Sequence, residues 1–497
     1  MAGWSRRTDR RATTPSDAFY PRRRLGVSMP DEDYRVEQDS LGEMEVPADA
    51  YWGAQTQRAV ENFPISGLTF QRRFIRALGV VKKAAAEANL ELERIPAEEG
   101  RAIVEAADEV VAGAHDDQFP VDVFQTGSGT SSNMNANEVI ANRATEIYGG
   151  EVGSREIHPN DHVNRGQSSN DVIPTAMHVA GLEALEKDVI PALETLAEAL
   201  SAKEREFDGV VKTGRTHLQD ATPVRLGQEF GGYRTQLQKG VKRVASARDH
   251  LGELALGGTA VGTGLNTHPE FPGLAAQFVS SETGLEFREA DDHFEAQAAH
   301  DAMGEAHGAL RTVAGSMNKV ANDLRLLASG PRNGLGELEQ PENQPGSSIM
   351  PGKVNPVVAE SVNQVHKQVV GNDAAVAAGA ARGELELNLY KPVVAYDFLQ
   401  SAELIANAAE TFAERFVAKL EANEDHCRTR VEQSMALATA LNPAIGYDEA
   451  SEVAKRALAE GTSVREVAVA EGYLTEAEAD EVLDPAAMTE REILGEE

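Results

Sequence analysis

Apolar residues recur at intervals of three and four over long stretches of this chain. In residues 170–207 the recurring apolar positions are Leu182, Leu185, Val189, Leu193, Leu196 and Leu200. This spacing places the apolar side chains on one face of an α-helix. A helix over the whole segment would be about 57 Å long, beyond the usual globular helix, and Pro191 is expected to kink it.

Four more segments have the same pattern, at 226–253, 301–327, 355–382 and 392–422. Five long helices without strands repeated between them predict a helical bundle and not an α/β fold. We therefore predict an all-α fold with a central bundle of five long helices. Because such helices carry more apolar surface than one bundle can bury, we expect association with further copies of the chain.

The two ends of the chain differ from its middle. Residues 29–167 mix short strand-like pieces with helical patterns at 74–90 and 97–112, and short helices follow Asn442 and Pro443. The residues from Thr475 to Glu478 have the form of a capping box that opens one of these helices. We predict three domains: a mixed, mainly helical domain at 29–167, the long-helix domain at 168–423 and a small helical domain at 424–497.

The first 28 residues are unlike the rest. They are rich in arginine and contain no apolar core, so they do not form a secretory signal. Asp9, Asp17 and the acidic body of the chain make an organellar transit peptide a poor fit. We expect a disordered extension at 1–28, or an upstream start with Met29 as the true first residue, and a cytoplasmic protein.

The net charge of the chain limits the classes of partner that it can bind. The chain carries 80 acidic and 47 basic residues, a net charge of -33. Long-range repulsion therefore disfavours nucleic acid and anionic membranes, and no apolar run approaches the length of a membrane span. The dispersed acidic residues fit a halophilic surface that stays hydrated in concentrated salt, and an ordinary acidic cytoplasmic protein is the alternative.

Metal and disulfide chemistry are not indicated. A single cysteine, Cys427, excludes an intramolecular disulfide and any multi-cysteine metal site. The 12 histidines show no ligand spacing joined to a third ligand. We predict no metal site.

The most informative polar segment is residues 346–355, Gly-Ser-Ser-Ile-Met-Pro-Gly-Lys-Val-Asn, which leads into a long helical pattern. Backbone N–H groups of such a glycine-rich turn form an anion-binding concavity, and Lys353 adds a full positive charge. A nucleotide P-loop is excluded, because Gly346 and Gly352 are one residue too far apart and Val354 offers no hydroxyl to magnesium. We predict a small-anion site on a mobile loop.

Three further polar segments precede helical patterns, at 125–133, 158–171 and 214–220. Each is rich in hydroxyl and amide side chains, and by itself each is explained equally well as a turn with a helix cap. Together they suggest that several helix starts converge on one anionic ligand. The glycine-rich run 257–264 looks like a dinucleotide loop but lacks a βαβ context, so we expect a tight structural loop.

These segments resemble the signature regions of the fumarase/aspartase superfamily. The resemblance extends from about Asp39 to the C-terminus and is strongest toward the class II fumarate hydratases. The residues that favour these enzymes over aspartases are at 53–58, 125–130, 168–170 and 390–392, the last being Tyr-Lys-Pro. Residues 357–364 resemble aspartases instead.

The resemblance implies an all-α homotetramer with a core of twenty helices and with active sites assembled from three subunits. It implies reversible anti addition of water to fumarate, giving (S)-malate, without a cofactor. Two alternatives stay open: aspartate ammonia-lyase, which converts aspartate to fumarate and ammonia, and a structural tetramer without catalytic activity.

The same resemblance assigns the site residues. Ser347 is the base, and N–H groups of the turn containing Gly346, Ile349 and Met350 would stabilise its alkoxide. Loss of a proton next to a carboxylate builds a second negative charge there, and fixed donors must stabilise it. His217, paired with Glu360, would protonate or orient the departing hydroxyl. The substrate-binding residues are Ser128, Thr130, Ser168, Ser169, Asn170, Thr216, Lys353 and Asn355, and a second anion site near the entrance comprises Arg155, His158, Asn160 and Asp161.

Overall fold

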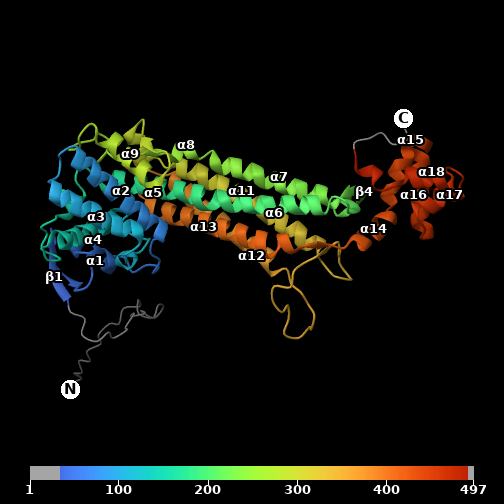
Figure 1. Ribbon diagram of the computed structural model, residues 1–497, viewed down its shortest axis with the longest axis horizontal. Coiled ribbons are helices and arrows are strands. Elements are labelled where there is room, and N and C mark those ends of the chain that lie inside the picture. Colours follow the sequence, from blue (N-terminus) through green and yellow to red (C-terminus); the bar gives the residue numbers. More distant parts are fainter. Residues whose placement is uncertain (1–33, 491–497) are drawn as a thin grey trace, which may run out of the picture.

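The computed structural model describes residues 34–490, so the extension predicted at 1–28 lies outside the described residues. The molecule is elongated, with an N-terminal part, a bundle of long helices and a small C-terminal part in succession along one axis (Figure 1). The all-α fold class is confirmed, because the sheets among the described residues are small and two-stranded. The domain boundaries at 167 and 423 remain a proposal.

The N-terminal part begins with an antiparallel hairpin of β1 (Tyr34–Asp39) and β2 (Gly42–Pro47). The helices that follow are α1 (Ala54–Asn62), α2 (Arg72–Glu91), α3 (Ala97–Ala112) and α4 (Thr130–Tyr148). Later in the chain α8 (Arg248–Leu251), α9 (Phe271–Thr283) and α10 (His293–Ala298) return to this part, and β5 (Glu253–Leu254) pairs with β6 (Arg288–Glu289).

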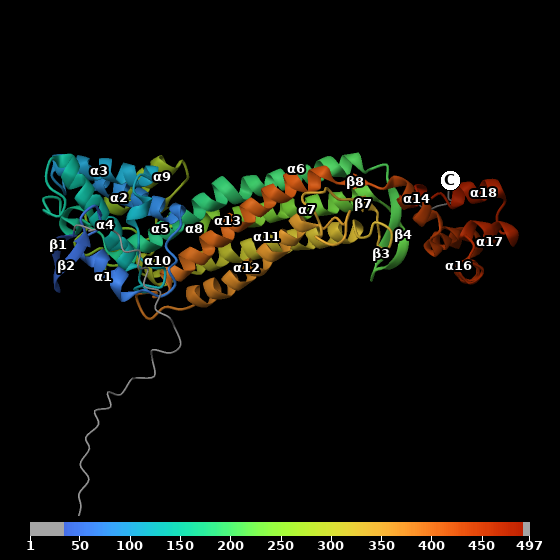
Figure 2. The same ribbon diagram turned by 90° about the horizontal axis from the view of Figure 1, so that it is seen from below.

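The long helices form the bundle in the middle of the molecule (Figure 2). They are α5 (Ser169–Ala184), α6 (Ile190–Glu206), α7 (Leu226–Ala245), α11 (Asp301–Leu327), α12 (Val357–Ala380) and α13 (Lys391–Arg415). All five predicted long helices are present. The first of them passes from α5 to α6 through a π-helical turn at Leu185–Val189, since Pro191 has no N–H for the regular ladder.

Two predicted helices end earlier than expected. The segment predicted at 226–253 ends at Ala245 and is followed by the separate α8, and the segment predicted at 392–422 ends at Arg415. The chain between α6 and α7 forms an antiparallel hairpin of β3 (Val211–Thr216) and β4 (Gln219–Arg225) at the far end of the bundle (Figure 2). A further short pair, β7 (Leu338–Glu339) with β8 (Glu421–Ala422), ties the segment after α11 to the segment after α13.

The C-terminal part contains α14 (Glu424–Glu432), α15 (Asn442–Ile445), α16 (Tyr447–Glu460), α17 (Val464–Ala470) and α18 (Glu476–Val482). Its apolar core, between Leu437 and Leu483, is separate from the large core that runs through the N-terminal part and the bundle. The predicted capping box at α18 is confirmed: Thr475 Oγ1 accepts from Glu478 N, and the Glu478 carboxylate accepts from Thr475 N.

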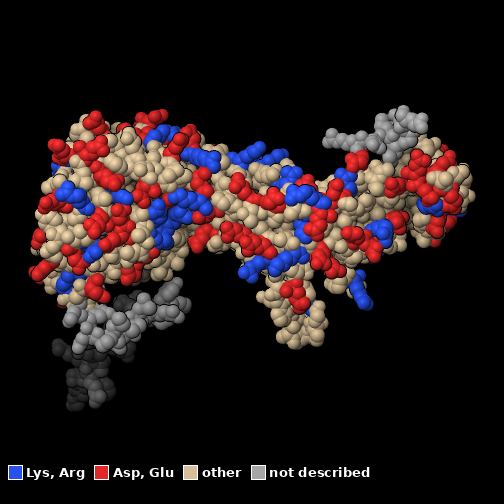
Figure 3. Space-filling model, viewed as in Figure 1, with Lys and Arg blue, Asp and Glu red and all other residues tan. Residues whose placement is uncertain are grey.

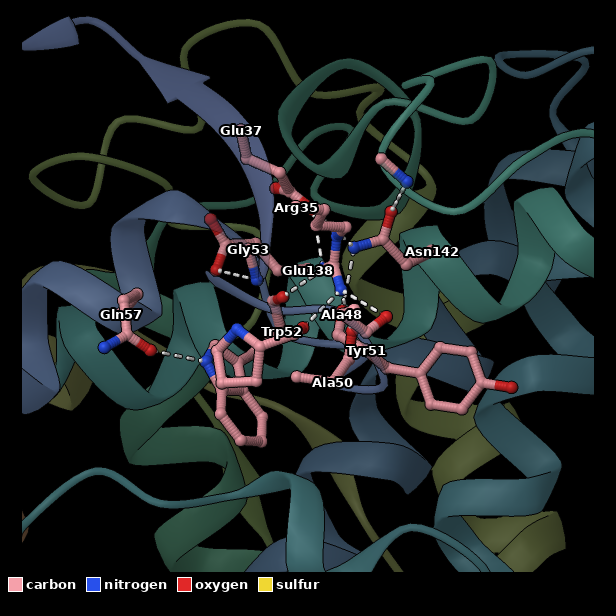
Figure 4. A network of polar contacts seen from close by, with 12 residues as sticks. Arg35, Glu37, Ala48, Ala50, Tyr51, Trp52, Gly53, Gln57, Glu138 and Asn142 are labelled. Carbon is pink, nitrogen blue, oxygen red and sulfur yellow. Dashed lines mark hydrogen bonds and ion pairs between the residues drawn. The ribbon is translucent and has the colours of Figure 1, made fainter. Parts of the chain in front are cut away.

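A buried carboxylate holds the start of α1 in place (Figure 4). Glu138, on α4, accepts hydrogen bonds from the main-chain N–H groups of Gly53, Gln55 and Thr56 at 2.9–3.0 Å. A Cβ at Gly53 would lie 2.5 Å from the nearest oxygen of Glu37, so no larger residue fits without a shift. The segment 53–56 is thereby fixed on α4.

Acidic side chains are spread over every part of the molecule on the face shown in Figure 3, with basic ones between them. Among residues 34–490, no helix combines the length and the apolar character needed to span a membrane.

Candidate active site

The predicted catalytic and substrate-binding residues other than Glu360 fall into three clusters, which lie apart within one chain. The α5 corner comprises Ser128, Thr130, Ser168, Ser169 and Asn170, the hairpin tip comprises Thr216 and His217, and the serine loop comprises residues 346–355. The start of α5 belongs to the N-terminal part, the β3–β4 hairpin lies at the opposite end of the bundle, and the segment before α12 projects from the side of the bundle (Figures 1 and 2). One chain therefore does not unite the three clusters.

The serine loop cradles the hydroxyl of Ser347. Ser347 Oγ accepts hydrogen bonds from the main-chain N–H groups of Ile349 (3.2 Å) and Met350 (3.1 Å). These are two of the three turn donors that the sequence predicted. Two N–H donors directed at one oxygen favour negative charge on that oxygen, as a base of alkoxide character requires.

The loop is closed by its own two ends. Asn355 Nδ2 donates to the main-chain oxygen of Gly346 at 2.6 Å. A Cβ at Gly346 would lie 1.9 Å from the main-chain oxygen of Lys353, so only glycine permits this approach. The Lys353 ammonium is exposed and makes no hydrogen bond or ion pair with any residue in 34–490. It is free to meet an anion.

The hairpin tip presents His217 in an unusual backbone conformation. His217 and Leu218 form the two-residue connection between β3 and β4, with φ of 56° and 61°. Both angles are positive, as in type I′ hairpin turns, although neither residue is glycine. His217 is exposed and has no hydrogen-bond partner among the described residues.

The predicted pair of His217 with Glu360 is not formed within one chain. Glu360 lies in the first turn of α12 with an exposed side chain, and no contact with His217 is present. The physical reason is placement: His217 lies on the turn between β3 and β4, a hairpin at the end of the bundle, whereas Glu360 lies on α12, a helix within the bundle (Figure 2). The pair remains a proposal for a contact between two copies.

Buried charges that sequence reasoning missed anchor the base of this hairpin. Lys212 is 1% exposed and pairs with Glu229 at 2.9 Å and with Glu337 at 3.2 Å. Arg215, next to Thr216, pairs with Glu337 at 2.8 Å. Strand β3 is thus held to α7 and to the segment after α11, which fixes the direction in which the tip projects.

Ser168 caps α5 in the ordinary structural way. Its Oγ accepts from Asn170 N at 3.2 Å, and Asp171 Oδ1 accepts from Ser168 N at 2.8 Å, which completes a capping box. Asn170 Nδ2 donates to the main-chain oxygen of Ala260 at 2.7 Å and keeps its second N–H free. The side chain of Asn170 is therefore oriented before any ligand binds.

Neighbouring segments complete the α5 corner. Ser128 and Thr130 share a hydrogen bond between their hydroxyls at 2.8 Å, at the start of α4. A Cβ at Gly127 would lie 2.0 Å from the main-chain oxygen of Leu389, so this loop also touches the approach to α13. The structure thus brings all five predicted residues of the corner to one place.

Asp171 is the most important residue of this corner that the sequence did not identify as functional. It is fully buried, and its Oδ2 accepts from Gly257 N (3.0 Å) and Thr259 N (2.9 Å). The glycine-rich run 257–264 is therefore a structural loop, as predicted. Burial raises the pKa of Asp171 to about 6. The capping-box spacing from Ser168 was the signal that could have identified it.

The predicted second anion site has an ordinary structural explanation for one of its members. His158 Nδ1 accepts from the N–H groups of Asn160 and Asp161, both at 3.2 Å, and so caps the π-helical turn at Pro159–Val163. Burial lowers the pKa of His158. Arg155, Asn160 and Asp161 are exposed, and anion binding by this segment remains a prediction. No three His, Cys, Asp or Glu side chains within 34–490 are arranged to hold a metal ion.

Comparison with known proteins identifies the family of the chain. Residues 42–371 match the family described as lyase, and residues 437–490 match the family described as fumarase C C-terminus. The class II fumarate hydratase of Halobacterium salinarum is 76% identical over 93% of this chain and 98% of its own length. The crystal structure of class II fumarase from Schistosoma mansoni has 40% identity and a TM-score of 0.90 over 92% of this chain and 99% of that one. The "fumarate lyase:delta crystallin" of Brucella melitensis has 48% identity and a TM-score of 0.89 over 92% of this chain and all of its own. The chain belongs to the class II fumarate hydratase family.

Proposed function

We propose that this protein is a lyase that catalyses the reversible addition of water to fumarate, giving (S)-malate, a reaction of the citric acid cycle. Family membership supports the substrate, and the observation that carries the chemistry is the pair of N–H groups directed at Ser347 Oγ. The N–H groups stabilise the alkoxide form of such a hydroxyl, and this alkoxide can take a proton from the carbon next to a carboxylate and become the neutral hydroxyl. No metal or cofactor enters this proposal.

In the malate-to-fumarate direction, Ser347 removes the proton and the neighbouring carboxylate becomes an aci-carboxylate. Lys353 and Asn355 stabilise the second negative charge that develops there. Thr130, Asn170 and Thr216, with the serine hydroxyls of the α5 corner, hold the two carboxylates by neutral hydrogen bonds and fix the geometry. His217, oriented by Glu360, protonates or orients the departing hydroxyl.

The same proposal requires more than one copy of the chain. The α5 corner, the hairpin tip and the serine loop lie at separate places along one molecule, yet each holds groups that one small dicarboxylate needs. We infer a homotetramer in which three subunits contribute to each active site, located in the cytoplasm. Arg155, His158, Asn160 and Asp161 would bind a second anion near the entrance.

Malate and aspartate supplied side by side test the reaction. The fumarate double bond absorbs in the ultraviolet, so either reaction yields a signal. The proposal expects signal from malate without release of ammonia. An absorbance signal from aspartate, with release of ammonia, would instead identify an ammonia-lyase. No absorbance change with either substrate would favour a non-catalytic structural protein.

Mixing two inactive variants tests the shared site. Ser347→Ala and His217→Asn would be denatured together, refolded and assayed with malate. If the two residues come from different subunits, some sites in the hybrids are intact, and roughly a quarter of the parent activity returns. If both residues of a site belong to one chain, every site lacks one of them and the mixture stays inactive.

A further inference from the structure

Three helices, α4, α5 and α13, begin at the α5 corner. Asn133 of α4 donates Nδ2 to Ser169 Oγ of α5 at 2.9 Å, and Lys391, the first residue of α13, donates Nζ to the main-chain oxygen of Asn170 at 3.2 Å. The first turn of every helix exposes N–H groups with partial positive charge. The main chain alone therefore gives the α5 corner a positive electrostatic potential, to which charged side chains add.

Lys391 occupies an unfavourable position for a cation. It is 0% exposed, and within residues 34–490 its ammonium forms no ion pair and a single hydrogen bond, to Asn170. A helix start repels a positive charge, whereas a helix end attracts one. Burial accordingly lowers the pKa of Lys391 to about 7.

A second buried ammonium adds to the positive charge. Lys82 on α2 is also 0% exposed and donates to the amide oxygens of Asn164 (2.9 Å) and Gln167 (3.0 Å), which carry no charge. Burial lowers its pKa to about 7 as well. Both lysines are within electrostatic reach of one carboxylate, Asp171.

Asp171 cannot neutralise both lysines and three helix starts. Its two oxygens already accept three main-chain N–H groups. The other titratable groups that face Lys391 add no negative charge: His300, before α11, is fully buried with both ring nitrogens unpaired, burial keeps its pKa well below the ordinary value, and beyond it lies His178. Positive charge is thus left over at the place where the predicted substrate-binding residues meet.

We propose that Lys391 is a positioning residue for the dicarboxylate substrate. Its ammonium holds the main chain of Asn170 by a hydrogen bond, and the bound carboxylate neutralises its buried positive charge. The inference rests on the proposed function. Lys391 acts through Asn170, whose free amide N–H contacts the substrate. The charge strengthens substrate binding in the ground state and in the transition state alike, so its loss raises KM more than it lowers kcat.

The test compares Lys391→Met with Lys391→Arg, which keeps the charge, and with Lys203→Met as a matched control. Lys203 is also buried, at 6% exposed, and also donates to a main-chain oxygen, that of Leu420 at 2.6 Å. Unlike Lys391 it also pairs with Glu206 at 2.8 Å, and it lies at the end of α6, away from the corner. We expect Lys391→Met to raise the KM for fumarate about 10- to 100-fold with a smaller change in kcat. Lys391→Arg should recover most of that loss, and Lys203→Met should change stability only. Equal KM values for Lys391→Met and the parent enzyme would overturn the proposal.

A pH profile and a binding measurement separate this role from a structural one. In the parent enzyme, KM should rise as the pH passes through about 7, because Lys391 loses its proton there, and the rise should be smaller in Lys391→Met. Calorimetry with succinate, which has no double bond to hydrate, should show proton uptake on binding by the parent and less uptake by Lys391→Met. Equal uptake by the two proteins contradicts the proposal even if neither turns over fumarate. If the parent protein bound succinate normally but did not turn over fumarate, this result would count against the proposed function alone.

Discussion

The buried carboxylate of Asp171 allows a prediction whose size follows from its contacts. Asp171→Ala leaves the N–H groups of Ser168, Gly257 and Thr259 without their acceptor. A buried donor left unpaired costs about 2 kcal/mol, so three cost roughly 6 kcal/mol. Removing the carboxylate also relieves the burial of a charge, which raises the pKa of Asp171 from 3.8 to about 6 even against these three hydrogen bonds, and this relief offsets part of the cost. We expect a net loss of unfolding free energy of roughly 3 kcal/mol, about half of the cost of the three unpaired donors.

Asp292→Ala is the matched control, because Asp292 also caps a helix with its carboxylate. It accepts from Phe294 N and Glu295 N at the start of α10, but it is exposed, and water can replace it. Its loss should cost about 1 kcal/mol. Guanidinium unfolding, followed by tryptophan fluorescence at one fixed protein concentration, measures both variants against the parent. A loss for Asp171→Ala no greater than that for Asp292→Ala would refute the reasoning.

The pH dependence of the same difference has a definite sign. The pKa of Asp171 is higher in the folded state than in the unfolded chain, so the folded state binds more protons between about pH 4 and about pH 6. The stability that Asp171 contributes is therefore full at low pH and is partly lost as the pH rises through about 6. The gap between parent and Asp171→Ala should accordingly be larger at about pH 5 than at about pH 7.5. A gap that widens with rising pH would contradict this sign.

Three further predictions concern activity. Ser347→Ala should lower kcat for malate by about 10²- to 10⁴-fold at unchanged helix content by circular dichroism, and equal turnover by variant and parent would remove Ser347 as the base. Gly346→Ala should lower kcat/KM about 100-fold, because its Cβ would lie 1.9 Å from the oxygen of Lys353, whereas Gly371→Ala, with no atom within 4 Å, should leave activity unchanged. Activity should rise between about 0.1 M and about 1 M salt, over which the Debye length falls from about 10 Å to about 3 Å, and a flat or falling salt profile would argue against a halophilic enzyme.

Sequence reasoning predicted the long helices well because their apolar faces repeat with the helical period. The helix at 301–327 was predicted to the residue. The π-helical turn before Pro191 has no such periodic signal, although the proline itself marked the place. Helix ends at Ala245 and Arg415 were missed, because apolar spacing continues past both residues while the backbone turns away.

For the candidate site, sequence motifs identified the residues proposed to bind the ligand better than the buried residues that hold them in place. The turn donors to Ser347 were predicted because glycine and hydroxyl residues have strong local preferences. Lys82 and Lys391 are buried by contacts between segments far apart in the chain, and residue spacing along one sequence does not reveal such burial, whereas the capping-box spacing from Ser168 did mark Asp171. The proposed pairing of His217 with Glu360 requires a second copy, which the periodicity of one chain cannot describe.

The distribution of charge explains how a chain of net charge -33 can still bind a dianion. Acidic side chains at the surface repel the substrate at long range, but dissolved ions screen them. Lys82 and Lys391 are fully buried, so salt reaches them far less, and their attraction persists in concentrated salt. Salt therefore screens the repulsion between the surface carboxylates and the substrate, and it leaves the attraction by the two buried lysines in place. It follows that the ratio of KM between Lys391→Met and the parent should stay nearly constant as salt rises, even while both absolute values change. If the KM ratio between the variant and the parent instead fell to about one at high salt, the attracting charge would lie at the surface and not in the α5 corner.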